Sequence, residues 1–132
     1  MFVFREIMLG KWLFYAVGFE HKSYFMRYNR NMVEIQETSE YSAWFADLKD
    51  RTTRARINVR IRRLALGNPG DVKPVGEGVS ELRIDFGPGF RIYFIQRGEQ
   101  FIVLLGGGSK ATQPIDISAA IALARALKEQ KS

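Results

Sequence analysis

Between Leu82 and Phe94 the chain reads Leu-Arg-Ile-Asp-Phe-Gly-Pro-Gly-Phe-Arg-Ile-Tyr-Phe, a pattern that indicates a β-hairpin. Apolar and polar residues alternate on both sides of residues 87–89, as they do in strands with one buried face, and Gly-Pro-Gly is typical of a turn. One register puts every apolar residue on the same face and pairs them as follows: Phe86 with Phe90, Ile84 with Ile92, and Leu82 with Phe94.

The other face of this hairpin is predicted to carry four reactive side chains: Arg83, Asp85, Arg91 and Tyr93. In the same register Arg83 faces Tyr93, and Asp85 faces Arg91. Arginine binds phosphate oxygens bidentately and keeps its charge, and tyrosine can stack on a base or hydrogen-bond through its hydroxyl. The same residues also fit a solvated ladder of cross-strand pairs, in which the ion pair of Asp85 with Arg91 contributes little to stability.

Apolar spacing along the rest of the chain predicts an α+β fold: two N-terminal helices and a C-terminal helix packed on a small, mostly antiparallel, twisted sheet. The expected elements are a strand at 33–36, a helix capped by Thr38 or Ser39, a helix from about Thr52 to Leu66, strands at 72–75 and 101–105, and a last helix opened by Pro114. The strand at 101–105 is apolar at every position, which is typical of a central strand covered on both faces.

Composition limits the classes of function. The net charge is +6 and the pI is about 9.8, which favours polyanionic partners such as nucleic acid, although many small domains are basic without a specific reason. There is no Cys, which excludes disulfides and thiolate metal sites and suits the cytoplasm. The single His, His21, excludes a histidine metal cluster and a Ser-His triad, so no metal or cofactor is expected.

The first 31 residues differ from the rest in composition, because they hold nine aromatic residues and the remaining 101 hold eight. The apolar run from Trp12 to Phe19 is much shorter than the roughly 20 residues that span a bilayer. We therefore expect a start at Met32, with residues 1–31 as an extension and 32–132 as the domain. A membrane-surface segment and an extra packing element are the alternatives.

Several separated blocks of the sequence resemble the RelE/ParE superfamily of bacterial toxins, and most closely its HigB-like addiction module killer proteins. The resemblance runs from about Met32 to about Lys131. The blocks that carry it are Gly70-Asp-Val-Lys-Pro-Val-Gly76, Ser80-Glu-Leu-Arg-Ile84, Gly87-Pro-Gly-Phe-Arg-Ile-Tyr-Phe94, and Gly106-Gly107 followed by Lys110, Thr112, Gln113, Asp116 and Ile117.

The resemblance implies a RelE-like fold and a toxin of a type II toxin–antitoxin system. Such a toxin is an mRNA endoribonuclease that works without metal on ribosome-bound message, and its partners are the ribosome and a cognate antitoxin, here expected to be of the helix-turn-helix type. Two alternatives stay open. ParE-like members inhibit DNA gyrase without cutting nucleic acid, and an inactive prophage remnant would only bind its antitoxin.

The resemblance also implies roles for single residues. Matching toxins place sheet arginines and an aromatic residue near the scissile phosphate, which points to Arg83, Arg91 and Tyr93. Some HigB-type toxins use histidines in the cleft, and residues 32–132 contain none. The residues left to share the proton transfers are Lys73, Lys110, Asp85 and Tyr93. Lys73 can instead be an edge-strand lysine that discourages aggregation.

Two further features bear on partners. The predicted register places Gly106 opposite Arg91, so that a substrate backbone can approach the arginine, although residues 106–110 also read as a flexible connector. The second helix carries six arginines and no acidic residue between Arg51 and Leu66: Arg51, Arg54, Arg56, Arg60, Arg62 and Arg63. This surface suits ribosomal RNA or an acidic antitoxin segment, or is a solvated helix face.

Overall fold

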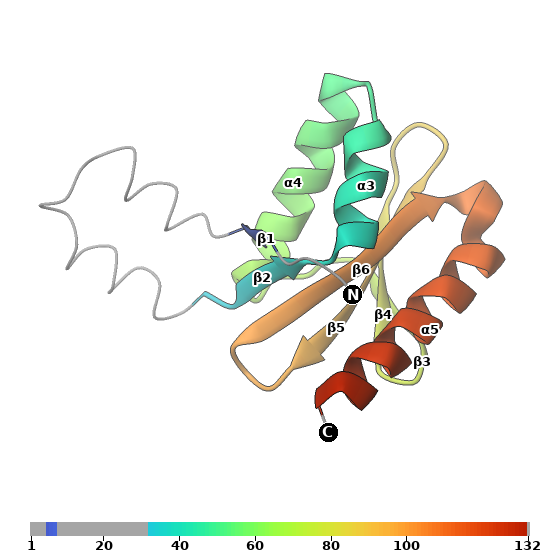
Figure 1. Ribbon diagram of the computed structural model, residues 1–132. Helices are drawn as coiled ribbons and strands as arrows, with labels where there is room; N and C mark the ends of the chain where they lie inside the picture. Colours follow the sequence, from blue (N-terminus) through green and yellow to red (C-terminus); the bar gives the residue numbers. More distant parts are fainter. Residues whose placement is uncertain (1–4, 8–31, 132) are drawn as a thin grey trace, which may run out of the picture.

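A six-stranded mixed sheet lies between two helical layers (Figure 1). The computed structural model describes residues 5–7 and 32–131. Its elements are β1 (Arg5–Ile7), β2 (Glu34–Glu37), α3 (Ser39–Asp47), α4 (Arg51–Ala65), β3 (Val72–Gly76), β4 (Val79–Ile84), β5 (Phe90–Arg97), β6 (Phe101–Ser109), the 3-10 turn η2 (Lys110–Thr112) and α5 (Gln113–Lys131). The strand order is β1-β2-β6-β5-β4-β3. Only the β2–β6 pair among these is parallel.

The predicted α+β class is confirmed, and β6 is the central strand that its uninterrupted apolar sequence indicated, since it lies between β2 and β5. The placement of the helices differs from the prediction. Two helices at the N-terminal end were expected, whereas α3 and α4 follow β2 in the middle of the chain, and α5 lies at the C-terminal end. β2 and β6 can pair in parallel because α3 and α4 lie in the long connection between β2 and the antiparallel strands that follow.

The two middle helices begin at side-chain caps. Thr38 accepts a hydrogen bond from the backbone N–H of Tyr41 and caps α3, as predicted. Asp50 accepts hydrogen bonds from the backbone N–H and the hydroxyl of Thr53, at 2.9 and 2.7 Å, and caps α4. Each cap satisfies N–H groups that have no partner within the helix. α4 therefore begins at Arg51, one residue before the expected helix start at Thr52.

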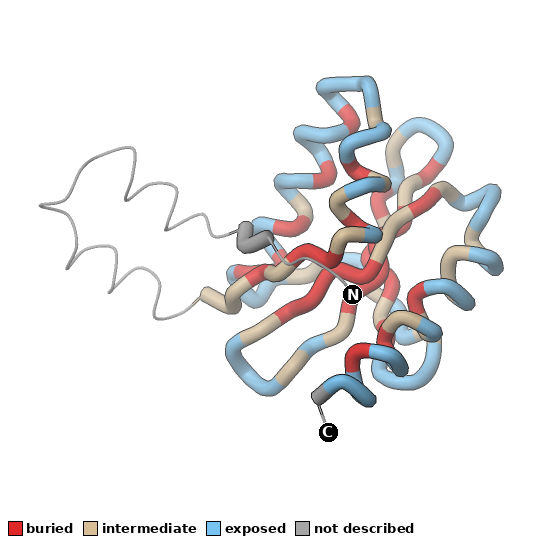
Figure 2. The backbone as a smooth tube through the Cα atoms, viewed as in Figure 1, coloured by how far each residue is buried: buried red, intermediate tan, exposed pale blue. Residues whose placement is uncertain are grey.

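Strand alternation divides the core into two clusters, one on each face of the sheet. On one face α3 and α4 cover the apolar residues that define the predicted hairpin face, including Leu82, Ile84, Ile92 and Phe94. On the other face α5 packs through Ala120, Ala124 and Leu127 against a second set: Val79, Tyr93, Val103 and Leu105. Figure 2 shows that the buried segments follow the strands and recur along the helices. None of the described helices has the length and apolar character needed to cross a membrane.

The β4–β5 register is two residues away from the predicted one. Arg83 lies opposite Arg91, not Tyr93, and the other pairs are Ile84 with Phe90, Leu82 with Ile92, and Glu81 with Tyr93. The strands stop earlier because residues 85–89 form the turn, closed by the Gly89 N–H to Phe86 carbonyl bond of 3.0 Å. Gly87 and Gly89 have φ of 57° and 79°, which few other residues adopt at low cost. A two-residue shift leaves every side chain on its predicted face.

The β5–β6 register is also corrected. The ladder shifts by one residue between Tyr93 and Phe94, so Gly106 lies opposite Tyr93, and Gly108, not Gly106, lies opposite Arg91. Such a bulge adds a residue to one strand and cannot be seen in an apolar run. Because of this bulge, the three consecutive glycines at 106–108 have different neighbours around their Cβ positions.

A Cβ at Gly107 would lie 2.5 Å from the ring of Trp44, and one at Gly108 would overlap the carboxylate of Asp116. At Gly106 nothing lies within 4 Å of the Cβ position. We therefore expect Gly107→Ala to lower the free energy of unfolding by about 1–3 kcal/mol through overpacking. Gly106→Ala should leave it unchanged or raise it by about 0.5–1 kcal/mol. Urea denaturation of the two variants measures both values, and equal effects would contradict the assigned bulge.

One described element, β1, lies on the N-terminal side of the expected division at Met32. Residues 5–7 form β1, which pairs antiparallel with β2 through Arg5 with Glu37 and Ile7 with Ile35. These three residues thus form an edge strand of the sheet. The expected start at Met32 itself is not tested, and the apolar run from Trp12 to Phe19 and His21 lie outside the described residues.

Removal of residues 1–31 should leave a cooperatively folded domain, because the described members of both core clusters lie between residues 32 and 127. Circular dichroism melts of the full chain and of residues 32–132 would compare the two. A shortened chain without a cooperative transition would show that the N-terminal segment is part of the fold.

Candidate functional site

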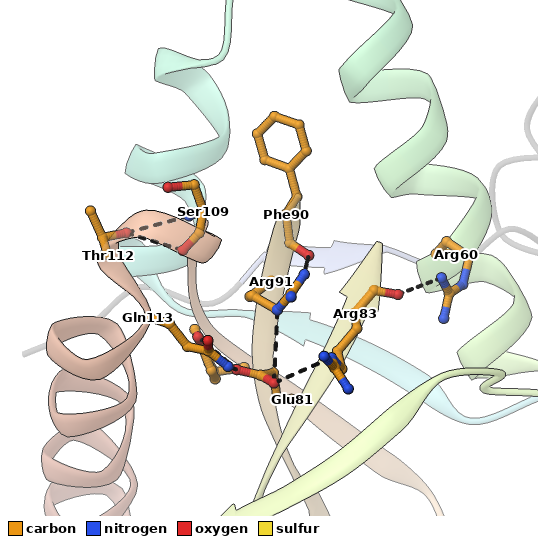
Figure 3. Close-up of polar contacts among 9 residues, drawn as sticks. Arg60, Glu81, Arg83, Phe90, Arg91, Ser109, Thr112 and Gln113 are labelled. Atoms are coloured by element: carbon orange, nitrogen blue, oxygen red, sulfur yellow. Dashed lines mark hydrogen bonds and ion pairs between the residues drawn. The ribbon is translucent and has the colours of Figure 1, made fainter. Parts of the chain in front are cut away.

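A fully buried carboxylate, that of Glu81 on β4, lies at the centre of the polar side chains on the α5 face of the sheet. Its Oε2 atom accepts hydrogen bonds from the Tyr93 hydroxyl at 3.0 Å and from Gln113 Nε2 at 2.7 Å. Its Oε1 atom lies 3.9 Å from the Nε atoms of both Arg83 and Arg91 (Figure 3). Glu81 therefore connects β4, β5 and the first turn of α5.

The two arginines differ in access to solvent. The side chain of Arg83 is 39 % exposed, whereas that of Arg91 is 5 % exposed, and Arg91 NH1 donates to the carbonyl of Phe90 at 3.1 Å. At 3.9 Å their contacts with Glu81 are ion pairs and not hydrogen bonds. Among the described residues Glu81 Oε1 and both Nε atoms have no hydrogen-bond partner. Buried polar atoms without a hydrogen-bond partner are rare in proteins overall, and where they occur they often mark a functional site.

Arg91 was expected to be the principal phosphate ligand because it would face an open glycine. The structure corrects that reason. Arg91 is buried and faces Gly108, whose Cβ position is occupied by Asp116. Arg83, directly opposite Arg91, is the arginine that a ligand reaches from solvent, and the Nε atoms of both arginines lie 3.9 Å from the same Glu81 oxygen.

Tyr93 has no exposed surface, so its ring cannot stack on a base as expected. Burial raises the pKa of its hydroxyl above the ordinary range, and the hydrogen bond to Glu81 raises it further. The phenol therefore stays protonated and serves as a hydrogen-bond donor to the carboxylate.

Among the predicted residues, Lys73 lies on this face, Lys110 lies at the adjoining turn, and Asp85 lies away from it. Lys73 on β3 lies directly opposite Glu81, and directly opposite residues of an antiparallel pair share a face. Lys110 is exposed at the start of η2, where its backbone N–H donates to the Gly89 carbonyl at 2.8 Å. Asp85 was expected across from Arg91; it is exposed in the turn beyond β4 and lies near α4 instead.

The six arginines of α4 do not form one surface. Arg54 lies over the ring of Phe45, and Arg56 over the ring of Phe86, at 4.9 and 4.2 Å from the ring centres. Arg60 is half-buried, and Arg62 lies outside the groove described next. A groove of about 700 Å³ between α4 and the β4–β5 turn is lined by four of the six arginines together with other residues: Arg51, Thr52, Ala55, Arg56, Val59, Arg60, Arg63, Ile84, Asp85 and Phe86.

Two members of the site were not predicted as functional residues. Glu81 and Gln113 both stand within blocks that resemble the toxin family, yet neither has a distinctive type or spacing. Their meeting depends on α5 crossing β4, which no local pattern specifies. Within residues 5–7 and 32–131, no group of three or more His, Cys, Asp or Glu gathers closely enough to hold a metal ion.

Fold and site together define a small α+β protein with a basic polar site on one sheet face, built around a buried glutamate. The chain is 43 % identical over 95 residues to an uncharacterized protein of Haemophilus influenzae, a match that covers 72 % of this chain and 96 % of the relative. The chain belongs to the same family as that protein. No protein-family model and no solved structure matches the chain.

The raised pKa of Tyr93 predicts how stability changes at alkaline pH. A free tyrosine ionises near pH 10, whereas the folded protein keeps Tyr93 protonated above that value. Its contribution is fully present below about pH 10 and is lost as pH rises, by about 1.4 kcal/mol per pH unit. The free energy of unfolding, measured by urea between pH 9 and 11, should thus fall more steeply for the natural chain than for Tyr93→Phe. Equal slopes would show that Tyr93 ionises in the folded state.

Proposed function

We propose that this protein is the toxin of a type II toxin–antitoxin system, with a RelE-like fold, and that it cleaves mRNA in the cytoplasm without metal, at the ribosome. The observation that carries the proposal is the direct pairing of Arg83 with Arg91 on a face that also holds Lys73. Lys110 lies at the adjoining turn. Two carboxylates, those of Glu81 and Asp116, lie among these four cations, so positive charge is in excess and the face favours a phosphodiester.

Arg83 is the residue that would bind the scissile phosphate. Its planar guanidinium matches two phosphate oxygens and stabilises charge as it develops in the transition state. The ion pair with Glu81 holds it in place. The open space in front of Gly106 admits the sugar–phosphate backbone, because no side chain occupies it.

The chemistry we propose is attack by the 2′-oxygen on the adjacent phosphorus. The bond from phosphorus to the 5′-oxygen breaks, which leaves a 2′,3′-cyclic phosphate and a 5′-hydroxyl. The 2′-hydroxyl loses a proton and the leaving oxygen gains one. With Tyr93 buried and Asp85 away from the site, these transfers fall to the exposed Lys73 and Lys110.

The second candidate function is a ParE-like inhibitor of DNA gyrase, which binds its target without cutting it. The arginine-lined groove along α4 favours it, since a binding surface there needs none of the sheet-face residues. An inactive remnant that binds only an antitoxin would also use such a surface. Induced expression separates the candidates: new 5′ ends within reading frames support the ribonuclease, and double-strand DNA breaks support the gyrase inhibitor.

Arg83→Ala should abolish cleavage and growth arrest while the protein stays folded. Loss of one transition-state ligand of this kind typically costs about 10²–10³ in rate. Primer extension on cellular mRNA after induction measures the cut sites. Arg62→Ala is the matched control, because Arg62 is exposed on α4, outside both the sheet-face site and the groove.

A fully active Arg83→Ala variant would show that the sheet face is not the active site. Arg91→Ala is less informative alone, since it leaves Glu81 buried with one charged partner fewer and is expected to lower stability as well.

A further inference from the structure

The groove between α4 and the β4–β5 turn is the second strongly charged feature of the molecule, and it lies on the opposite side of β4 from Glu81. Ile84 belongs to the α4 face and lines the groove, whereas Glu81 and Arg83 alternate with it onto the α5 face. The groove is therefore separate from the site proposed to act on RNA.

Two arginines of the groove, Arg56 and Arg60, are held in position by neutral groups. Arg60 donates to the backbone carbonyl of Arg83 at 2.7 Å (Figure 3), and to that of Pro69 at 3.0 Å. Arg56 lies over the ring of Phe86, 4.2 Å from its centre. Among the described residues, no carboxylate lies within 4.0 Å of either guanidinium. Their positive charge is thus oriented in advance and available to an anionic partner.

Apart from Thr52 and Asp85, the walls between these arginines are apolar. Val59, 48 % exposed, lies on α4 one turn from Arg56 and Arg63, and Ala55 and Phe86 extend the apolar surface. A nucleic acid backbone gains little from such a surface, and the Phe86 ring that could stack on a base is covered by Arg56. A peptide with both carboxylates and apolar side chains matches both parts of the groove.

We propose that this groove binds an acidic peptide segment of a partner protein, with apolar side chains against Val59 and Ala55 and carboxylates on Arg56 and Arg63. The proposal does not depend on the ribonuclease activity. Because the groove and Arg83 are on opposite faces of β4, such a peptide leaves the exposed guanidinium of Arg83 accessible.

The test uses the full chain and a short fluorescein-labelled peptide in which leucines occupy one helical face among glutamates. Fluorescence anisotropy measures its dissociation constant. Arg56→Glu should weaken binding by about tenfold or more, because attraction becomes repulsion. Arg62→Glu, the same change of charge on the same helix outside the groove, should leave binding within about twofold. Val59→Asp should weaken binding while circular dichroism shows an unchanged fold, since the side chain is half exposed.

Two further probes distinguish the acidic apolar peptide from other ligands of the groove. A peptide with serine in place of leucine should bind at least several-fold more weakly, and a single-stranded RNA oligonucleotide should lose no more affinity from Arg56→Glu than from Arg62→Glu. The proposal is overturned if the leucine peptide does not bind, if the two charge reversals weaken it equally, or if the serine peptide binds as tightly. RNA binding that depends specifically on Arg56 would assign the groove to nucleic acid.

Discussion

The buried carboxylate of Glu81 is the constraint on which the polar half of the structure depends. Removal of a carboxylate from water costs several kcal/mol, and the cost must be offset by partners that stay in place. Two hydrogen bonds, from Tyr93 and Gln113, and two arginines supply the offset. Since these partners come from β4, β5 and α5, any slip among the three elements would leave the charge without them. The position of Arg83 near solvent is a consequence of that arrangement.

The glycines of β6 also help to position α5 against the sheet. Gly107 and Gly108 allow the strand to pass directly beneath Trp44 on one face and Asp116 on the other, so both helical layers approach the sheet closely at one point. Asp116 in turn accepts a hydrogen bond from Thr112 at the start of α5. The turn that carries Gln113 towards Glu81 is thereby fixed. Gly106, one position earlier, differs because no atom lies within 4 Å of its Cβ position.

The sequence predicted what local physics determines and missed what depends on distant contacts. Alternation assigned residues 82–94 to the correct faces, yet a two-residue change of register preserves every face and is invisible to it. The caps of α3 and α4 lie within a few residues of what they cap, and Thr38 was recognised for that reason. Glu81 looked like an ordinary strand residue because its burial requires α5 to cross β4. Arg60 was expected on a solvent face, and only the carbonyls of Arg83 and Pro69 explain its inward position.

Arg60 joins the groove to the sheet-face site, because it lines the groove and its guanidinium donates to the backbone carbonyl of Arg83. A carboxylate in the groove could draw Arg60 away from that carbonyl. The loss would amount to about one neutral hydrogen bond, roughly 1 kcal/mol, which corresponds to about a fivefold change in an equilibrium. The carbonyl belongs to a paired strand anchored by Glu81, so the remaining contacts keep Arg83 in position. A partner in the groove would therefore adjust the site only slightly, and strong inhibition would require the partner to extend around β4 and cover Arg83 itself.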